Sequence, residues 1–218
     1  MRRLRAPKAL GITPAQQAVS LQAVSLLLGY PEPDLVAQVP LLRAVAAELP
    51  EPARLPLERM CDHLEATPVP ELQAHYTDVF DLRRRCCLYL TYFSYGDTRQ
   101  RGMALLRFSH VYKGSGLEFV GGELPDHLGV VCEFAATADL ELGVRLLNEN
   151  RAAIELIRTA LVDAGSFYAD VLDVVRAALP EAAPRDLEKA LELARTGPPE
   201  EEVGLEPFGP PELMGARR

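Results

Sequence analysis

Apolar residues recur at intervals of three and four positions along most of the chain, which is the pattern of amphipathic helices. Residues that favour helix ends support the predicted helix boundaries. Thr13 can cap the first helix, with Gln16 completing a capping box, and Gly29 can end it. Asp97 is the predicted N-cap of a later helix. The pattern predicts helices over residues 14–28, 41–49, 57–65, 71–80, 97–115, 140–161 and 168–179, and two more that begin at Pro125 and Pro184.

The stretch from Cys86 to Tyr95 has β-propensity, but no other stretch of similar character offers it a partner strand. We therefore expect a buried helical or irregular segment there. The prediction is an all-α, single-domain helical bundle of roughly eight to ten helices. The sequence contains no glycine-rich phosphate loop and no GxSxG or HExxH motif.

Composition divides the chain into three parts. Residues 1–12 predict a flexible basic arm, and residues 13–196 predict the all-α domain. Residues 197–218 are rich in Pro, Gly and Glu, which indicates an acidic, disordered tail.

Charge narrows the function classes. The net charge is −8, and removing the four positive charges of Arg2, Arg3, Arg5 and Lys8 leaves −12 for the remainder. Such an acidic body argues against nucleic-acid binding and favours a basic partner, although an ordinary cytoplasmic protein can be as acidic. No run of about 18 apolar residues is present, so membrane insertion is not expected. The Arg2-Arg3 pair precedes an amphipathic segment and not an apolar signal region, so we expect a cytoplasmic protein.

The four cysteines, Cys61, Cys86, Cys87 and Cys132, include no CxxC pair. Cys61 and His63 could ligate a metal, but no second pair stands at zinc spacing. Buried structural thiols in a reducing compartment are the favoured interpretation, and no metal site is predicted.

Glu123, Asp126 and His127 stand close together in GELPDHLG, residues 122–129. They could perform acid–base chemistry, because His127 is the group there that titrates near neutrality. No obvious nucleophile accompanies them. Pro125 and Asp126 are also ordinary residues at a helix start, where a carboxylate complements the helix macrodipole. The residues alone favour the helix start and leave a functional site open.

Arg99, Arg101 and Gly102 lie in GDTRQRG, residues 96–102. Two arginines spaced by two positions project to different sides of a helix, so they could brace different neighbours. Gly102 would allow another backbone to approach closely. A solvated helix start with a salt bridge between helices explains the same residues, and the sequence does not separate the two interpretations.

The third cluster is HYTDVFDLRRR, residues 75–85, in which Tyr76, Val79 and Phe80 share a predicted face with Asp78 and Asp81 nearby. An apolar surface edged by carboxylates would suit a basic amphipathic peptide. A core helix with a solvated edge is the plainer alternative. None of the clusters contains a convincing nucleophile–base pair, so we expect no catalytic residues.

Taken in order, the clusters resemble a known family. LYLTYFSYGDTRQRGMALLRF (Leu88–Phe108), then GELPDHLGVVCEFAA (Gly122–Ala136), with the earlier TDVFD (Thr77–Asp81), are similar to the NarJ-type nitrate reductase assembly chaperones. These delta subunits are related to the TorD-like molybdoenzyme chaperones. The resemblance covers roughly residues 15–195 and is strongest from Tyr76 to Ala136.

The resemblance implies a non-catalytic cytoplasmic chaperone that serves nitrate assimilation by binding an unfolded or immature protein. Its partner would be the catalytic (alpha) subunit of respiratory nitrate reductase, recognised through a basic amphipathic N-terminal segment. The chaperone would keep that subunit competent for insertion of the molybdenum cofactor, bis-molybdopterin guanine dinucleotide, before membrane docking. It would hold no permanent cofactor itself, and cofactor delivery proteins would be further partners.

On this resemblance, the peptide would lie in a trough. The residues predicted to line the trough are Tyr76, Phe80, Asp81, Glu123, Asp126 and His127. The residues predicted to shape it are Asp97, Arg99, Arg101, Gly102 and Pro125. The chain departs from the family pattern at Gly129, where some members have proline, and Cys86-Cys87 has no family role. Two alternatives stay open. One is a helical adaptor for another partner, and the other is a metal-dependent α-helical enzyme that uses His127 with Glu123 or Asp126.

Overall fold

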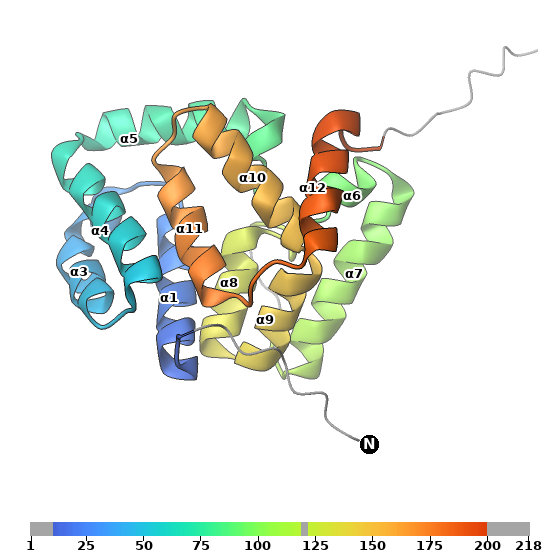
Figure 1. Cartoon of the computed structure of the whole chain (residues 1–218), viewed down its shortest axis with the longest axis horizontal. Coiled ribbons are helices and arrows are strands. Elements are labelled where there is room, and N and C mark those ends of the chain that lie inside the picture. The colour runs from blue at the N-terminus through green and yellow to red at the C-terminus, as the bar shows by residue number, and fades with distance from the viewer. Residues whose placement is uncertain (1–10, 119–121, 200–218) are drawn as a thin grey trace, which may run out of the picture.

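The computed structural model describes residues 11–118 and 122–199, and the regular elements in these ranges are helical (Figure 1). The all-α prediction is confirmed. The predicted flexibility of the arm and the tail concerns mostly residues 1–10 and 200–218, which lie outside the described ranges. The helices are α1 (Pro14–Leu27), α2 (Pro33–Ala37), α3 (Val39–Ala47), α4 (Glu51–Ala66), α5 (Val69–Tyr76), α6 (Tyr92–Tyr95), α7 (Arg99–Gly114), α8 (Leu128–Thr137), α9 (Leu140–Glu149), α10 (Arg151–Asp163), α11 (Tyr168–Ala178) and α12 (Pro184–Thr196), with a π-helical turn η1 (Thr77–Asp81) and a 3-10 turn η2 (Arg84–Cys86).

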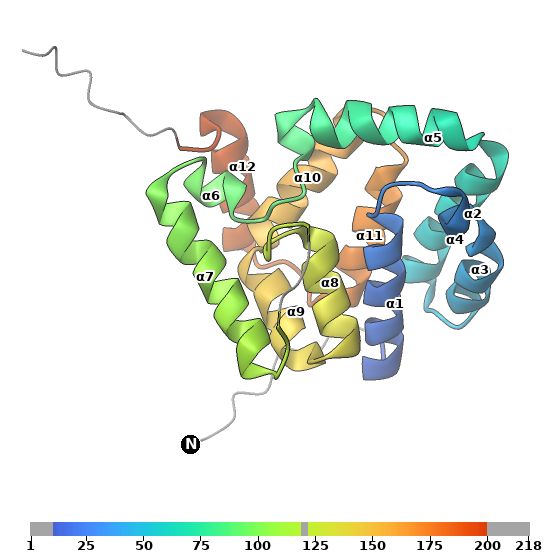
Figure 2. The same cartoon turned by 180° about the vertical axis from the view of Figure 1, so that it is seen from behind.

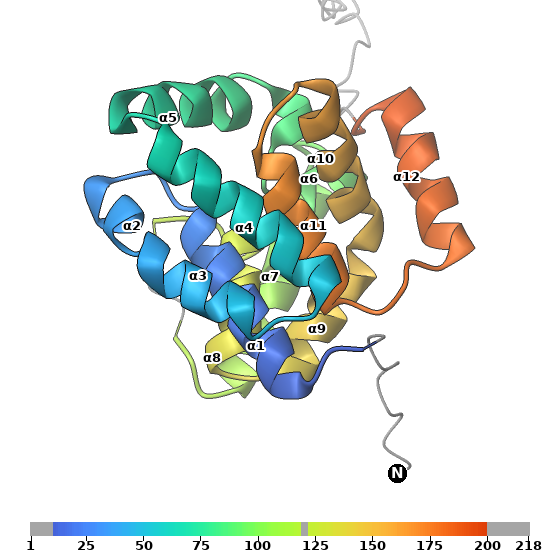
Figure 3. The same ribbon diagram turned by 60° about the vertical axis from the view of Figure 1, so that its left-hand side comes forward.

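Helix α1 packs against α8, α11 and α3, and its first turn lies at the lower edge of the molecule in Figure 3. Its residues Leu21, Val24 and Leu27 have no exposed surface. The predicted capping box is confirmed, because Thr13 Oγ1 accepts a hydrogen bond from Gln16 N (3.2 Å) while Gln16 Oε1 accepts one from Thr13 N (3.0 Å). The capping box satisfies backbone groups at the start of α1 that have no partner within the helix.

The other helices pack on these elements and on one another. Helix α4 packs on α11 and α3, α8 pairs with α9, and α10 lies between α11 and α12. In both Figure 1 and Figure 2, α5 runs along the top of the bundle. Helices α12 and α7 stand on the side opposite to α3 and α4. No helix in the described part of the chain is long and apolar enough to cross a membrane.

Several predicted boundaries were wrong, and helix α4 begins at Glu51, six residues before the predicted Leu57. Helix α7 is capped by Thr98 and not by Asp97, and α8 begins at Leu128 and not at Pro125. The helix predicted over residues 140–161 is divided at Asn150, whose backbone (φ −103°, ψ 21°) leaves the helical range, so α9 and α10 change direction there. This break and the short helices α2 and α6 bring the described residues to twelve α-helices, above the eight to ten predicted.

The helix predicted over residues 71–80 changes type half-way. Helix α5 ends at Tyr76 and continues into η1, where Leu82 N donates to Thr77 O (3.2 Å) across five residues. A π-helical turn is wider than an α-helical one and often marks a functional segment. It turns Val79 into the core and leaves Asp81 exposed.

Helices α8 and α9 meet at a point where only glycine fits. A Cβ placed on Gly143 would lie 2.3 Å from Ala135 Cβ and 2.5 Å from Ala135 Cα, which is closer than non-bonded carbons can come. The two helices therefore cross with their backbones nearly touching, and this contact fixes the direction of α9 after the short turn at Ala138 and Asp139.

Replacing Gly143 by alanine should lower the free energy of unfolding by roughly 1–3 kcal/mol, because α8 and α9 would have to move apart. Gly102 is a matched control, since it is helical and exposed and a Cβ there meets no described atom within 4 Å. Gly102→Ala should stabilise the protein by about 0.5–1 kcal/mol through helix propensity. Urea unfolding measures both, and midpoints that shift in the same direction would contradict the packing argument.

Candidate functional site

Two segments that are distant in sequence run side by side next to α8. Tyr89 and His127 form an isolated antiparallel bridge pair. Leu90 N–H donates to Asp126 O (3.1 Å), and Leu128 N–H donates to Leu88 O (2.9 Å). In the stretch from Cys86 to Tyr95, which has β-propensity, Tyr89 alone thus forms a bridge pair among the described residues. This agrees with the prediction of a helical or irregular buried segment.

Asp126 holds these segments together from inside. Its side chain is fully buried, and its Oδ2 accepts hydrogen bonds from Thr91 N (3.0 Å) and Thr91 Oγ1 (2.6 Å). Tyr112 from α7 donates to the carbonyl of the preceding Pro125 (2.6 Å). Burial, and then the charge of Asp126, raises the pKa of Tyr112. Asp126 therefore fixes the shape of the loop, and it presents no carboxylate to a groove.

His127 occupies the N-cap position of α8, where its side chain makes no capping hydrogen bond, and it is nearly buried. Its ring meets the ring of Tyr89 edge to face, with centroids 5.5 Å apart. Burial lowers the pKa of His127, and the carboxylates of Glu123 and Asp126 oppose that shift only in part. The imidazole is consequently neutral at physiological pH, and it lies beside the Tyr89 ring with little of it open to a partner.

Tyr89 connects this loop to α7. Its hydroxyl donates to Glu123 Oε2 (2.6 Å), and the guanidinium of Arg101 lies 5.6 Å from its ring centroid. Arg101 also lies 5.7 Å from the ring of Tyr92 and pairs with Asp97 (3.0 Å). This is the geometry of a cation that braces α7 against the 89–92 segment.

A second cluster surrounds Tyr76 at the end of α5. The Tyr76 hydroxyl donates to Leu28 O (3.0 Å), and its ring contacts Tyr30 (5.4 Å between centroids), Phe80 (4.8 Å) and Tyr168 (5.9 Å). The pKa of Tyr76 is raised to about 12 by burial and then by the charges of Glu123 and Asp81. The charges of both carboxylates thus act on the Tyr76 hydroxyl, so two of the predicted sequence clusters influence each other electrostatically.

Exposed apolar side chains stand next to these carboxylates. Leu82, after Asp81, is 72% exposed, and Leu124, after Glu123, is 39% exposed. Tyr30, which contacts Tyr76, is 49% exposed. We call this set the Tyr76 surface: Tyr30, Tyr76, Phe80, Asp81, Leu82, Glu123 and Leu124. Apolar groups edged by carboxylates form a surface that complements a peptide with apolar and basic residues.

The remaining predicted residues lie apart from this surface or inside the fold. Arg99 is exposed in the first turn of α7, and Pro125 is buried. Gly102 is exposed, and no described atom lies within 4 Å of a Cβ placed on it, which agrees with the solvated helix start of the two interpretations left open. The prediction of Asp126 and Pro125 at a helix start was wrong, because α8 begins at Leu128 and the Asp126 carboxylate turns toward Thr91.

Sequence reasoning missed several contributors, namely Tyr30, Leu82, Tyr89, Thr91 and Leu124. The aromatic-rich LYLTYFSY stretch was the available signal for two of them. It also missed a contact of 2.8 Å between His75 Nε2 and Ser166 Oγ. Ser166 is buried and also accepts from Tyr168 N (3.3 Å), so this pair organises the start of α11. In the described ranges, no three His, Cys, Asp or Glu side chains gather closely enough to hold a metal ion.

The sequence model of the nitrate reductase delta subunit matches residues 46–172, which is more than half of the chain. The chain belongs to this family. All residues of the Tyr76 surface except Tyr30 fall within the delta-subunit match, and so do Tyr89, Thr91, Asp126 and His127. Helices α1, α2 and α12 lie outside it, as do most of α3 and the second half of α11.

Individual relatives agree with the delta-subunit assignment. The nitrate reductase-like protein NarX of Mycobacterium tuberculosis is 39% identical over 154 residues, which are 71% of this chain and 23% of NarX, so the chain spans about a quarter of that relative. The nitrate reductase molybdenum cofactor assembly chaperone NarJ of Bacillus subtilis is 32% identical over 171 residues, covering 77% of this chain and 92% of that protein. NarJ of Escherichia coli K12 is 30% identical over 160 residues, covering 72% and 68%.

A solved structure shares the fold. A redox enzyme maturation protein from Archaeoglobus fulgidus aligns with a TM-score of 0.56 and 23% identity, covering 80% of this chain and 97% of that chain. At this level of identity the likeness concerns the arrangement of the helices, and it agrees with the all-α architecture predicted from the sequence.

Asp126→Ala should lower the free energy of unfolding by about 1–3 kcal/mol, because Thr91 N would be left buried without an acceptor. Asp97→Ala is the control, since its side chain is 76% exposed and its pair with Arg101 should contribute less than about 1 kcal/mol. A double-mutant cycle with Thr91→Val, measured by urea unfolding, should show that the two buried residues are coupled. Additive effects of Asp126→Ala and Thr91→Val would contradict this role.

The stability of the protein should fall as the pH is lowered through the ordinary pKa range of histidine. Burial lowers the folded-state pKa of His127, His63 and His75, so the unfolded chain takes up protons first. His127→Gln should therefore reduce the loss of stability between about pH 7 and pH 5 without abolishing it, because His63 and His75 remain. Urea midpoints across this range measure the effect, with exposed His110→Gln as control. Equal slopes in both variants and the parent would refute it.

Proposed function

We propose that this protein is an assembly chaperone that binds the N-terminal segment of the immature catalytic (alpha) subunit of a nitrate reductase. It keeps that subunit competent for molybdenum cofactor insertion before the subunit docks at the membrane. The names of the B. subtilis and E. coli relatives support the class of function, since both are nitrate reductase molybdenum cofactor assembly chaperones. The proposed activity is binding and not catalysis.

The Tyr76 surface is the observation that carries the proposal. A peptide helix with apolar residues on one face would pack on Tyr30, Leu82 and Leu124. Basic residues beside that face would meet the carboxylates of Asp81 and Glu123. The hydrogen bond from Tyr89 holds the Glu123 side chain in place before the peptide binds. Because this side chain is already ordered, the entropic cost of association is lower.

The acidic body of the protein supports the same partner. With a net charge of −8 for the chain, the long-range field attracts a basic segment and raises the rate of encounter. The cofactor is cargo for the partner in this proposal, and the chaperone acts by holding the protein that awaits it. No observation favours the helical enzyme that uses His127, because His127 is nearly buried and Asp126 is bonded to Thr91.

Calorimetric titration with a peptide of the N-terminal segment of the catalytic subunit from the same source tests the proposal. Binding should weaken with added salt, since part of the attraction is between exposed charges. The double variant Asp81→Asn/Glu123→Gln should weaken binding at low salt by roughly three- to tenfold, because exposed ion pairs contribute up to about 1 kcal/mol each.

The matched control is Glu133→Gln/Glu141→Gln, which removes two exposed carboxylates from α8 and α9. It should leave the affinity within about twofold of the parent, because those charges lie outside the Tyr76 surface. Tyr30→Ala should reduce affinity at both low and high salt, since its contribution is apolar. Equal losses in the control and the test variant would show that only the net charge matters, and no binding at any salt would refute the proposed partner.

A further inference from the structure

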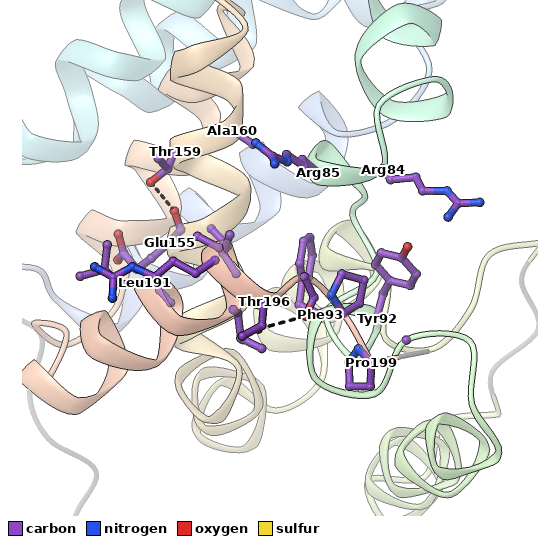
Figure 4. Close-up of a pocket in the computed structure, with 18 of the residues that line it drawn as sticks. Arg84, Arg85, Tyr92, Phe93, Glu155, Thr159, Ala160, Leu191, Thr196 and Pro199 are labelled. Carbon is purple, nitrogen blue, oxygen red and sulfur yellow. Dashed lines mark hydrogen bonds between the residues drawn. The ribbon is translucent and has the colours of Figure 1, made fainter. Parts of the chain in front are cut away.

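A second surface, separate from the Tyr76 surface, lies between α10, α12 and the segment from Arg84 to Asp97. It is a groove of about 1320 Å³, and Figure 4 shows residues from all three elements around it. Its apolar lining comes from aromatic side chains of α6 and leucines of α10 and α12, namely Tyr92, Phe93, Leu156, Leu187 and Leu191. Leu191 is 60% exposed although it lines this groove, so the apolar lining is not filled by described residues.

The groove is positively charged, in contrast to the protein as a whole. Arg84, Arg85 and Arg195 line it, and none of them forms an ion pair with another described residue. Asp163 is the one lining carboxylate that is likewise unpaired among the described residues.

The other carboxylates at the groove are already neutralised. Glu155 accepts from Arg151 Nε (2.8 Å) and pairs with Arg176 (3.1 Å), while Asp97 pairs with Arg101 (3.0 Å). Three unpaired cations against one unpaired anion leave an excess of positive charge at an apolar groove. A basic peptide does not fit this surface, whereas an acidic segment with apolar residues does.

The chain itself leaves the described structure from this groove. Pro198 and Pro199 line it, and Gly96 (φ +55°) lies against Pro199, so closely that a Cβ on Gly96 would be 1.8 Å from Pro199 O. The next three residues in the sequence are Glu200, Glu201 and Glu202, followed within six positions by Val203, Leu205 and Phe208. Since each extended residue spans about 3.3–3.6 Å, all three carboxylates start within roughly 11 Å of Pro199.

We propose that this groove is the docking surface of the chain's own segment 200–208. Glu200, Glu201 and Glu202 pair with Arg84 and Arg85, and Leu205 and Phe208 cover the apolar lining. A segment tethered at Pro199 has an effective concentration in the millimolar range, so a few modest contacts are enough to keep it bound. The docked acidic segment covers the positive groove and leaves the Tyr76 surface exposed. The two surfaces thus bind partners of opposite charge.

The test uses the full chain and a fluorescent reporter. The protein contains no tryptophan, so Phe208→Trp introduces a single indole. In the docked state its emission should be blue-shifted and its acrylamide quenching constant should be well below that of the urea-unfolded chain. In this background, Arg84→Glu/Arg85→Glu should red-shift the emission and raise the quenching constant toward the unfolded value.

The charge-swap variant makes the test specific. Adding Glu200→Lys, Glu201→Lys and Glu202→Lys to the reversed arginines should restore the blue shift and the protection. The control is Arg54→Glu/Arg145→Glu, which reverses two charges on α4 and α9 and should leave the emission unchanged. Circular dichroism of each variant verifies that the helices are retained.

Other outcomes would overturn the proposal. Emission equal to that of the unfolded chain in the Phe208→Trp protein would show that the segment does not dock. Protection that survives reversal of Arg84 and Arg85 would place the segment elsewhere, and protection that rises with protein concentration would mean that the groove of a second copy is the acceptor. The fluorescence test contains no nitrate reductase peptide, so its failure would not bear on the proposed chaperone function. That function is tested separately by the calorimetric titration with the peptide.

Discussion

A buried carboxylate must be given hydrogen-bond donors, and in this protein that requirement shapes the region around α8. Asp126 takes its donors from Thr91, so the loop before α8 and the segment before α6 are fixed to each other. In the segments fixed this way, Tyr89 contacts Glu123 and Arg101, and the nearly buried His127 stands at the N-cap position of α8. Glu123 and Leu124, which precede Asp126 in the same loop, stay exposed.

Much of the helical framework could be predicted, because helix starts and apolar spacing are local properties. The capping box at Thr13 and the stripe on α11 are examples, and both stand as expected. The failures come from contacts that local rules do not contain. Asp126 has the composition of a helix start, but its partner Thr91 lies 35 residues away. In the same way, a pattern of apolar spacing does not show that α5 widens into a π turn after Tyr76.

The candidate site was predictable in composition more than in geometry. Tyr76, Asp81 and Glu123 were named from their clusters, but the contact that places Tyr76 beside the end of α1 is a hydrogen bond to Leu28 O, 48 residues away. Exposed leucines such as Leu82 carry no sequence signal, since apolar residues are assigned to the core by default. The net charge predicted an acidic protein but not where its charges lie. It did not indicate that Arg84 and Arg85 line a groove of opposite charge.

The π turn η1 bears on how the length of this chain can vary. A helix can absorb one inserted residue by widening a single turn, so the five residues from Thr77 to Asp81 have the form of an accommodated insertion. An extra residue within α1 would instead rotate every following side chain by about 100° and move Leu27 off the buried face. Insertions and deletions among related chains should therefore be tolerated at η1 and rejected in α1, so sequence alignments should allow a gap at the former position.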